Sequence, residues 1–263
     1  MKSTFPAAAA ALALFLPGAA AAAESAPPAS PSKPPAVSTA PADAWKQEVA
    51  LYVAAVGMTG RAGVGGVEAD VDLSFSEIMD QLQAAGMIAY RAEKGDWAVF
   101  ANAIFMGLGA TKDLRFGGTA EADFDETIFE VDGAWRFAKR WEVYGGARLV
   151  DIDASLELRP VTGTTVDADG SRSWVDPLVG LRYRAPLGEH WAFVGRADVG
   201  GFGVGSDLAW QALAHFDWRI SKHWGAAFGY VLLDIDYDDG EGSDRFLYDI
   251  RSEGPLAAAT ISF

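Results

Sequence analysis

The sequence predicts an all-β protein, an up-and-down antiparallel transmembrane β-barrel of ten strands. Tryptophan recurs directly after short polar turns, at Trp97, Trp141, Trp191 and Trp224. Between these turns lie segments in which apolar and polar residues alternate, and they are joined at their other ends by longer loops. Short turns at one end, longer loops at the other, and aromatic residues at the level of the short turns are typical of this fold.

Residues 1–23 are predicted to be a cleaved secretory signal peptide. An apolar stretch follows a single lysine, is interrupted by Pro17, and leads into a run of small residues that ends in an A-x-A cleavage site. An uncleaved anchor would need about 20 apolar residues without interruption. Residues 24–44 are rich in Pro, Ala and Ser, which predicts a disordered leader. The barrel domain is therefore expected to occupy residues 45–263.

The ten strands are identified by a period of two in the apolar residues. The apolar residues from Trp210 to Trp218 alternate with a polar set, which only a strand separates onto two faces. A β-propeller would need four strands per repeat, and a soluble sandwich would not explain a tryptophan after each short turn. An eight-stranded barrel, with the first or second strand misread, is the alternative. The predicted strands are 46–61, 85–93, 97–110, 124–137, 141–157, 172–186, 191–204, 207–220, 224–238 and 245–263.

The second and third predicted strands alternate least clearly. Phe100, Ile104 and Met106 fall on the face that should point inward. This pattern indicates either a locally apolar lumen or a packing partner inside the barrel.

The first long loop is predicted to contain one short helix. Ser74 and Glu77 have the spacing of a capping box, and Phe75, Ile78, Met79 and Leu82 lie on one helical face. The helix either dips this face into the barrel mouth as a lid or packs on neighbouring loops, and we favour packing.

The polar face of the predicted strands carries arginine together with aspartate or glutamate. Burying a charge without a partner is costly, so a near balance of the two signs predicts an ion-pair network that fills the lumen and holds the strands in register. A gated polar path is the alternative. The inward set consists of Glu130, Asp132, Arg136, Arg148, Asp176, Arg182, Arg184, Arg196, Asp198, Gln211, Asp217 and Arg219.

The four tryptophans after the short turns are predicted to form an outward aromatic girdle. An indole ring is apolar, yet its N–H group still needs a partner, so tryptophan prefers the interface between membrane and water. Trp97, Trp141, Trp191 and Trp224 should therefore lie at one level of the barrel.

The last predicted strand, which closes on residues 257–263 (AAATISF), resembles the C-terminal signature of Gram-negative outer-membrane barrels. Residues 173–180 and 200–207 resemble stretches of small proteobacterial outer-membrane proteins of the OmpA-like, OmpW-like and opacity-type superfamily. The resemblance implies export to the outer membrane, periplasmic termini, contact with outer-membrane lipid and lipopolysaccharide, and Phe263 as part of the signal read by the barrel-insertion machinery. Ile261 departs from the signature, which more often has an aromatic residue there.

Composition and motifs point away from several activities. The net charge of −15 argues against nucleic acid, and the absence of cysteine argues against disulfides and thiolate-bound metals. The acidic run 234–241 misses the calcium-loop spacing because Gly240 comes one place late, so no metal site or cofactor is predicted. His215 is the only histidine in a predicted strand, and no G-x-S-x-G-like element accompanies it, so the protein is not predicted to be an enzyme.

The predicted function is that of an outer-membrane barrel with a structural or surface-interaction role, whose extracellular partner the sequence does not identify. The first alternative is a narrow pore or passage for small or apolar solutes. The second is an outer-membrane lipid-modifying enzyme.

Overall fold

The computed structural model describes residues 44–65, 67–113, 118–160 and 165–263. The predicted signal peptide, and the predicted leader except for its last residue, lie outside this part of the chain. The described part is almost entirely β-structure, with one short α-helix and a single 3₁₀ turn, η1 (Gly242–Asp244).

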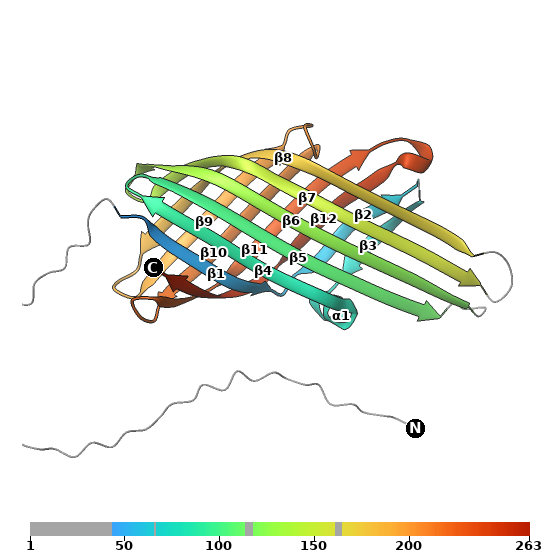
Figure 1. Ribbon diagram of the computed structural model, residues 1–263, viewed down its shortest axis with the longest axis horizontal. Coiled ribbons are helices and arrows are strands. Elements are labelled where there is room, and N and C mark those ends of the chain that lie inside the picture. Colours follow the sequence, from blue (N-terminus) through green and yellow to red (C-terminus); the bar gives the residue numbers. More distant parts are fainter. Residues whose placement is uncertain (1–43, 66, 114–117, 161–164) are drawn as a thin grey trace, which may run out of the picture. The chain divides into compact units, whose positions relative to one another are not determined.

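The strands close into one ten-stranded antiparallel barrel (Figure 1), which confirms the predicted fold and the strand number. Each strand pairs with its neighbours in chain order, and β1 (Lys46–Ala54) pairs with β12 (Phe246–Ser262) to close the sheet. Gln47 and Phe263 complete the closure by exchanging backbone hydrogen bonds of 3.0 Å. The strands between β1 and β12 are β4 (Leu82–Lys94), β5 (Trp97–Asp113), β6 (Gly118–Ala138), β7 (Trp141–Pro160), β8 (Val166–Pro186), β9 (Trp191–Gly201), β10 (Leu208–Arg219) and β11 (Trp224–Asp239).

The first strand differs from the prediction because it is broken after Ala54. Its continuation, β2 (Gly57–Val64), runs along β12 in the same register, and β3 (Val67–Leu73) folds back on β2 as an additional hairpin. The break lies opposite Pro255, whose missing N–H group removes a ladder donor. The sequence did not predict this hairpin.

β3 and the first half of β4 do not pair with each other. β1 pairs with β4 only as far as Ile88, so residues 82–87 have a strand partner on one edge only, β5, among the described residues. The helix α1 (Phe75–Gln81) connects β3 to β4 in the chain and contacts β2, β3 and β5.

The helix α1 begins with the predicted capping box. The Ser74 hydroxyl accepts a hydrogen bond from the Glu77 N–H group, and the Glu77 carboxylate accepts one from the Ser74 N–H group at 2.9 Å. The predicted apolar face is only partly buried, since Ile78 lies in the luminal core whereas Phe75 and Met79 are 42% and 49% exposed. Among the described residues, no helix is long and apolar enough to cross a membrane.

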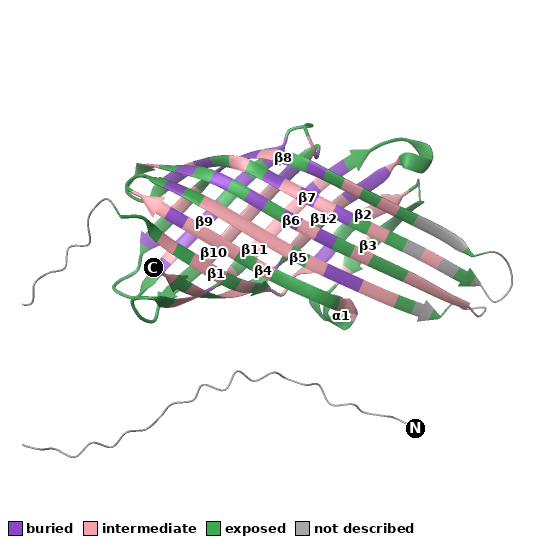
Figure 2. Ribbon diagram, viewed as in Figure 1, coloured by how far each residue is buried: buried purple, intermediate pink, exposed green. Residues whose placement is uncertain are grey.

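Successive residues of the strands alternate between buried and exposed (Figure 2). In β6, Val131 and Trp135 are exposed, whereas Asp132 and Ala134 between them are buried. In β11 the outward residues are apolar from Trp224 to Leu232, and the next outward position is an aspartate. Such a run matches the roughly 9–11 residues with which a tilted strand crosses a bilayer. The outer face is therefore an apolar belt, and the polar residues of this zone point into the lumen.

Candidate functional site

The central cluster, formed by Glu130, Asp132, Arg148, Arg196 and Asp198, lies inside the barrel between β6, β7 and β9. Arg148 is only 1% exposed and donates hydrogen bonds to Glu130 at 2.9 and 2.6 Å and to Asp198 at 2.9 Å. The forked guanidinium group suits such a double contact with carboxylates. All five residues belong to the predicted inward set, and the structure brings them together.

Arg196 is the second cation of the central cluster. It donates to Glu130, to Asp132 at 2.7 Å and to the Tyr144 hydroxyl at 2.8 Å. Its guanidinium carbon also lies over the rings of Phe100 and Tyr144, at 4.5 and 4.4 Å from their centroids. Cation–π contacts of this kind add to the ion pairs when the group is shielded from water. Arg196 therefore links the carboxylates of the central cluster to the inward Phe100 of β5.

A second set of ion pairs, the rim cluster, lies closer to the end of the barrel that carries the short turns. Its centre is Glu142, which accepts hydrogen bonds from Arg91 at 2.8 and 2.9 Å and from Arg136 and Arg182 at 3.1 Å. Glu93 joins the cluster through Arg136 at 3.2 Å. Arg136 and Arg182 belong to the predicted inward set. Glu142, Arg91 and Glu93 do not, although all three occupy inward positions of the same period-two pattern.

Asp176 and Arg219 do not belong to either cluster, which corrects their predicted place in the ion-pair network. The Asp176 carboxylate accepts hydrogen bonds from the N–H group and the hydroxyl of Ser206, both at 2.7 Å, and from the Trp174 indole at 3.3 Å. It holds the turn between β9 and β10. Arg219 is exposed and donates to the backbone carbonyl of Glu189 in the turn between β8 and β9.

Asp217 is paired with Arg184 and lies beside His215. The His215 Nδ1 atom is 2.9 Å from an Asp217 carboxylate oxygen. This pair gives the histidine a structural partner. Among the described residues, no group of histidines and acids is arranged to hold a metal ion.

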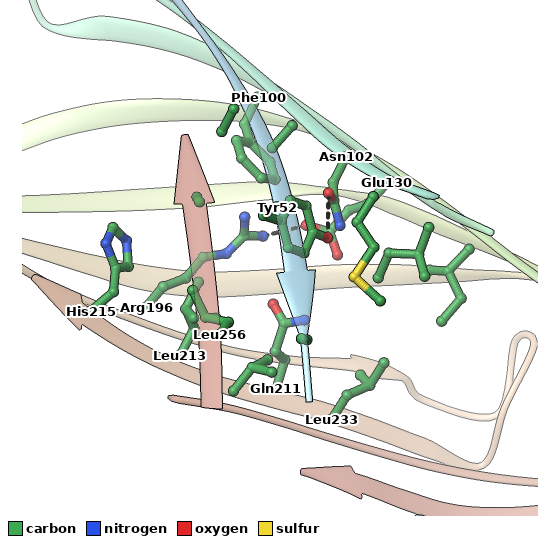
Figure 3. Close-up of a pocket in the computed structure, with 18 of the residues that line it drawn as sticks. Tyr52, Phe100, Asn102, Glu130, Arg196, Gln211, Leu213, His215, Leu233 and Leu256 are labelled. Carbon is green, nitrogen blue, oxygen red and sulfur yellow. Dashed lines mark hydrogen bonds and ion pairs between the residues drawn. The ribbon is translucent and has the colours of Figure 1, made fainter. Parts of the chain in front are cut away.

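The opposite side of the lumen, formed by β1, β4, β10, β11 and β12, is hollow. Its inward residues are mostly small or aliphatic, and together with residues of β5 and of the two charged clusters they line a cavity of about 240 Å³. Leu213, Leu233 and Leu256 point toward this cavity (Figure 3), and alanines such as Ala50 and Ala258 leave the space unfilled. Gln211, predicted to face inward, also lines it. The inward Phe100, Ile104 and Met106 complete an apolar wall on β5.

An aromatic cluster closes the cavity toward the end with the longer loops. Trp174 stacks on Tyr237 with ring centroids 4.0 Å apart, and Phe124 stacks on Tyr248 at 6.4 Å. Phe246 packs edge-on against Tyr237. These side chains and Ile78 of α1 belong to one buried cluster or pack against it.

Toward the short turns, the apolar cavity adjoins a polar vestibule. The vestibule has a volume of about 620 Å³, and charged residues and the two turn histidines line it. Glu48, Arg91 and Thr260 line both spaces. The hollow side of the lumen therefore leads from an aromatic closure at one end to a polar opening at the other.

The longer loops carry ion pairs of their own. Arg245 donates to Asp238 at 2.8 and 2.7 Å and also to Glu68. The hydrogen bond from Arg245 holds the pKa of Asp238 below its ordinary value. The acidic run that resembled a calcium loop is thus partly neutralised by an arginine.

The four predicted girdle tryptophans, Trp97, Trp141, Trp191 and Trp224, each open a strand and are exposed on the outer face. Trp191 stacks on Trp218 of the neighbouring strand, with ring centroids 5.7 Å apart. Their role at a membrane interface remains a prediction, as does the role of Phe263 in barrel insertion.

No protein-family model matches the sequence, and no curated protein matches it. The attachment invasion locus protein Ail of Yersinia pestis is 13% identical, with 84% of this chain and 99% of Ail covered and a TM-score of 0.37. The translocator domain of the autotransporter NalP from Neisseria meningitidis is 12% identical, with 84% and 89% covered and a TM-score of 0.38. The toluene transporter TodX of Pseudomonas putida is 12% identical, with 88% and 92% covered and a TM-score of 0.30.

The fold of the chain, a closed antiparallel β-barrel with an apolar outer belt, is given by its own structure. At these identities and TM-scores, the similarities give no information about activity.

Proposed function

We propose that the protein binds small apolar solutes in its lumen and forms a narrow passage for them across the outer membrane. The observation that carries this proposal is the apolar cavity beside the central cluster. The lumen is filled on one side and hollow on the other, and aliphatic side chains line the hollow side. Of the functions considered from the sequence, this geometry favours the passage for small or apolar solutes over a purely structural or surface-interaction role.

The volume of the cavity indicates the size of the solute. A cavity of about 150 Å³ lined by aliphatic and aromatic side chains is known to hold benzene, and drug-sized ligands need about 300–1,000 Å³. The present cavity of about 240 Å³ lies between these values. A single substituted ring, or an aliphatic chain of similar volume, fits it.

The charged side of the lumen limits what else could pass. Arg148 donates two hydrogen bonds to Glu130, and Arg91 donates two to Glu142, so these ion pairs fill the side of the lumen that they occupy and leave only the apolar side hollow. A wide aqueous channel is therefore not expected. The aromatic cluster around Trp174 must rearrange before a solute can leave toward the loops, so the structure represents a closed state.

A structural role is the second candidate, and the central cluster supports it. Buried ion pairs that link three strands fix their register whether or not a solute binds. In that case the cavity would be only a packing defect beside the network.

Filling the cavity tests the proposal. Ala258 lines the cavity, whereas Ala259, the next residue of β12, is exposed on the outer face. Ala258→Phe and Ala259→Phe therefore make the same chemical change on opposite faces of one strand. Binding of radiolabelled ethylbenzene is measured by equilibrium dialysis of the protein in lipid nanodiscs, with empty nanodiscs as the blank.

We expect the wild type and Ala259→Phe to bind ethylbenzene. Ala258→Phe should bind it at least about tenfold more weakly, because the new side chain occupies the cavity and excludes the ligand. The different mobility of boiled and unboiled protein in SDS shows that each variant is folded. Equal binding by the two folded variants, or no binding by the wild type above the blank, would contradict the proposal.

A further inference from the structure

One buried carboxylate faces the cavity without a cationic partner. Glu126 of β6 is 7% exposed and lines the cavity at the end closed by the aromatic cluster. One of its oxygens accepts a hydrogen bond of 2.6 Å from the Tyr248 hydroxyl. Among the described residues, this is its only side-chain polar contact, and no lysine, arginine or histidine lies within ion-pair distance.

The other buried carboxylates of the lumen are better supplied with donors. Glu130 and Asp198 contact arginines of the central cluster, and Asp176 accepts three hydrogen bonds. Each oxygen of a glutamate side chain can accept hydrogen bonds, and the Tyr248 hydroxyl is the one side-chain donor to Glu126 among the described residues, so Glu126 uses a small part of its capacity. Burying such a group without a partner is costly, and a ligand that supplies the missing donors would offset this cost.

The surroundings of Glu126 indicate the rest of the ligand. The cavity wall near it is aliphatic, so a ligand that reaches the carboxylate must place an apolar body along this wall. Tyr248 already supplies a neutral hydroxyl donor, and the contribution still missing is a positive charge. The wall residues next to Glu126 and Tyr248 along the strands are Ile104, Met106, Ile128, Leu233, Ile235 and Ile250.

We propose that Glu126 binds the protonated amino group of a small apolar amine, with Tyr248 orienting the carboxylate and the ring or chain of the amine lying in the cavity. This inference rests on the proposed function and specifies its solute. The barrel would then prefer amines of about one ring over hydrocarbons and neutral alcohols of the same shape.

A matched pair of probes tests this preference. 2-Phenylethylamine and propylbenzene have the same shape and differ only in whether the side chain ends in an ammonium or a methyl group. Both are titrated against the protein in nanodiscs of zwitterionic lipid, which gives the ammonium group no anionic surface to bind. The variants are Glu126→Gln, Tyr248→Phe and, as a control, Glu253→Gln, which makes the same change at an exposed position of β12.

We expect Glu126→Gln to weaken the binding of phenylethylamine by about tenfold or more, as the loss of a charged hydrogen bond does, and to leave propylbenzene binding nearly unchanged. Glu253→Gln should bind both probes like the wild type. Tyr248→Phe should still bind the amine, because the charge remains. Loss of amine binding in Tyr248→Phe together with its retention in Glu126→Gln would overturn the assignment.

The possible failures are distinguishable. If the wild type binds propylbenzene and Glu126→Gln leaves amine binding unchanged, the amine site is wrong and the proposed function stands. If the wild type binds neither probe, the proposed function itself fails. Should Glu126→Gln not fold, the wild type alone decides: it must bind phenylethylamine more tightly than 2-phenylethanol, and equal or weaker binding refutes the proposal.

Discussion

Replacing Arg148 with methionine should destabilise the barrel far more than replacing an exposed arginine. The Arg148 side chain is almost fully buried and makes three hydrogen bonds to two carboxylates, at 2.6–2.9 Å. Removing one partner of a buried ion pair costs about 3–5 kcal/mol, because it leaves an uncompensated charge. Glu130 keeps its contact with Arg196, and Asp198 keeps the Tyr144 hydroxyl at 2.9 Å. We therefore expect the lower end of this range, about 3 kcal/mol.

The matched control is Arg251→Met. Arg251 also pairs with an aspartate, Asp234, at 2.7 Å, but its side chain is 49% exposed. Exposed pairs contribute about 0–1 kcal/mol. Urea unfolding in lipid vesicles, followed by tryptophan fluorescence, measures both variants. At a urea dependence of about 1–3 kcal/mol per molar, a loss of 3 kcal/mol lowers the midpoint by about 1 M or more.

The double variant Arg148→Met/Glu130→Gln supplies an internal check. Because the two residues are in direct contact, their effects should not add, and the coupling energy should be about 0.5–3 kcal/mol. A midpoint for Arg148→Met equal to that of Arg251→Met, or strictly additive effects in the double variant, would refute the view that the central cluster holds the strands together.

Three further predictions concern conductance, pH and the helix. Planar-bilayer recordings of the wild type should show only small or rare conductances, and Arg196→Ala should increase them; steady channels of porin size in the wild type would show that the lumen is open. Because Arg245 lowers the pKa of Asp238, this ion pair contributes stability above the ordinary aspartate pKa of about 3.9 and loses it as the pH falls through the lowered value. Protection factors of the amides in the β11–β12 loop, which are corrected for the intrinsic exchange rate at each pH, should therefore fall only at acidic pH, and a fall that begins near neutral pH would contradict this. Ser74→Ala should cost α1 about 1 kcal/mol, seen as faster exchange of its amides, whereas unchanged exchange would mean that packing alone holds the helix.

The sequence allowed most of the fold to be predicted, because apolar outward residues and polar inward residues differ in kind. Trp97 and its equivalents mark where strands begin, and alternation marks which way their residues face. The break before Gly57 and the hairpin β2–β3 were missed. The signal for the break lies in Pro255 of a strand distant in sequence, and no local pattern near Ala54 reveals which strand will pair there.

The candidate site was less accessible to sequence analysis for a physical reason. A cavity arises where small side chains from several strands meet, and an inward Ala258 is indistinguishable from an outward Ala259 until the register is known. Glu126 falls on the inward face of the period-two pattern, as Glu130 does, and could have been included in the predicted inward set. Its lack of a cationic partner, however, depends on which residues the neighbouring strands bring opposite.

The most direct test of the hollow lumen is a crystal structure of the wild-type protein soaked with bromobenzene, with data collected at the bromine absorption edge. Bromine gives an anomalous signal that locates the solute independently of the protein. If the lumen is hollow, a peak is expected inside the barrel, between Leu213, Leu233 and Leu256 and beside the central cluster. Peaks confined to the outer apolar belt, with protein side chains filling the space between these leucines, would contradict it.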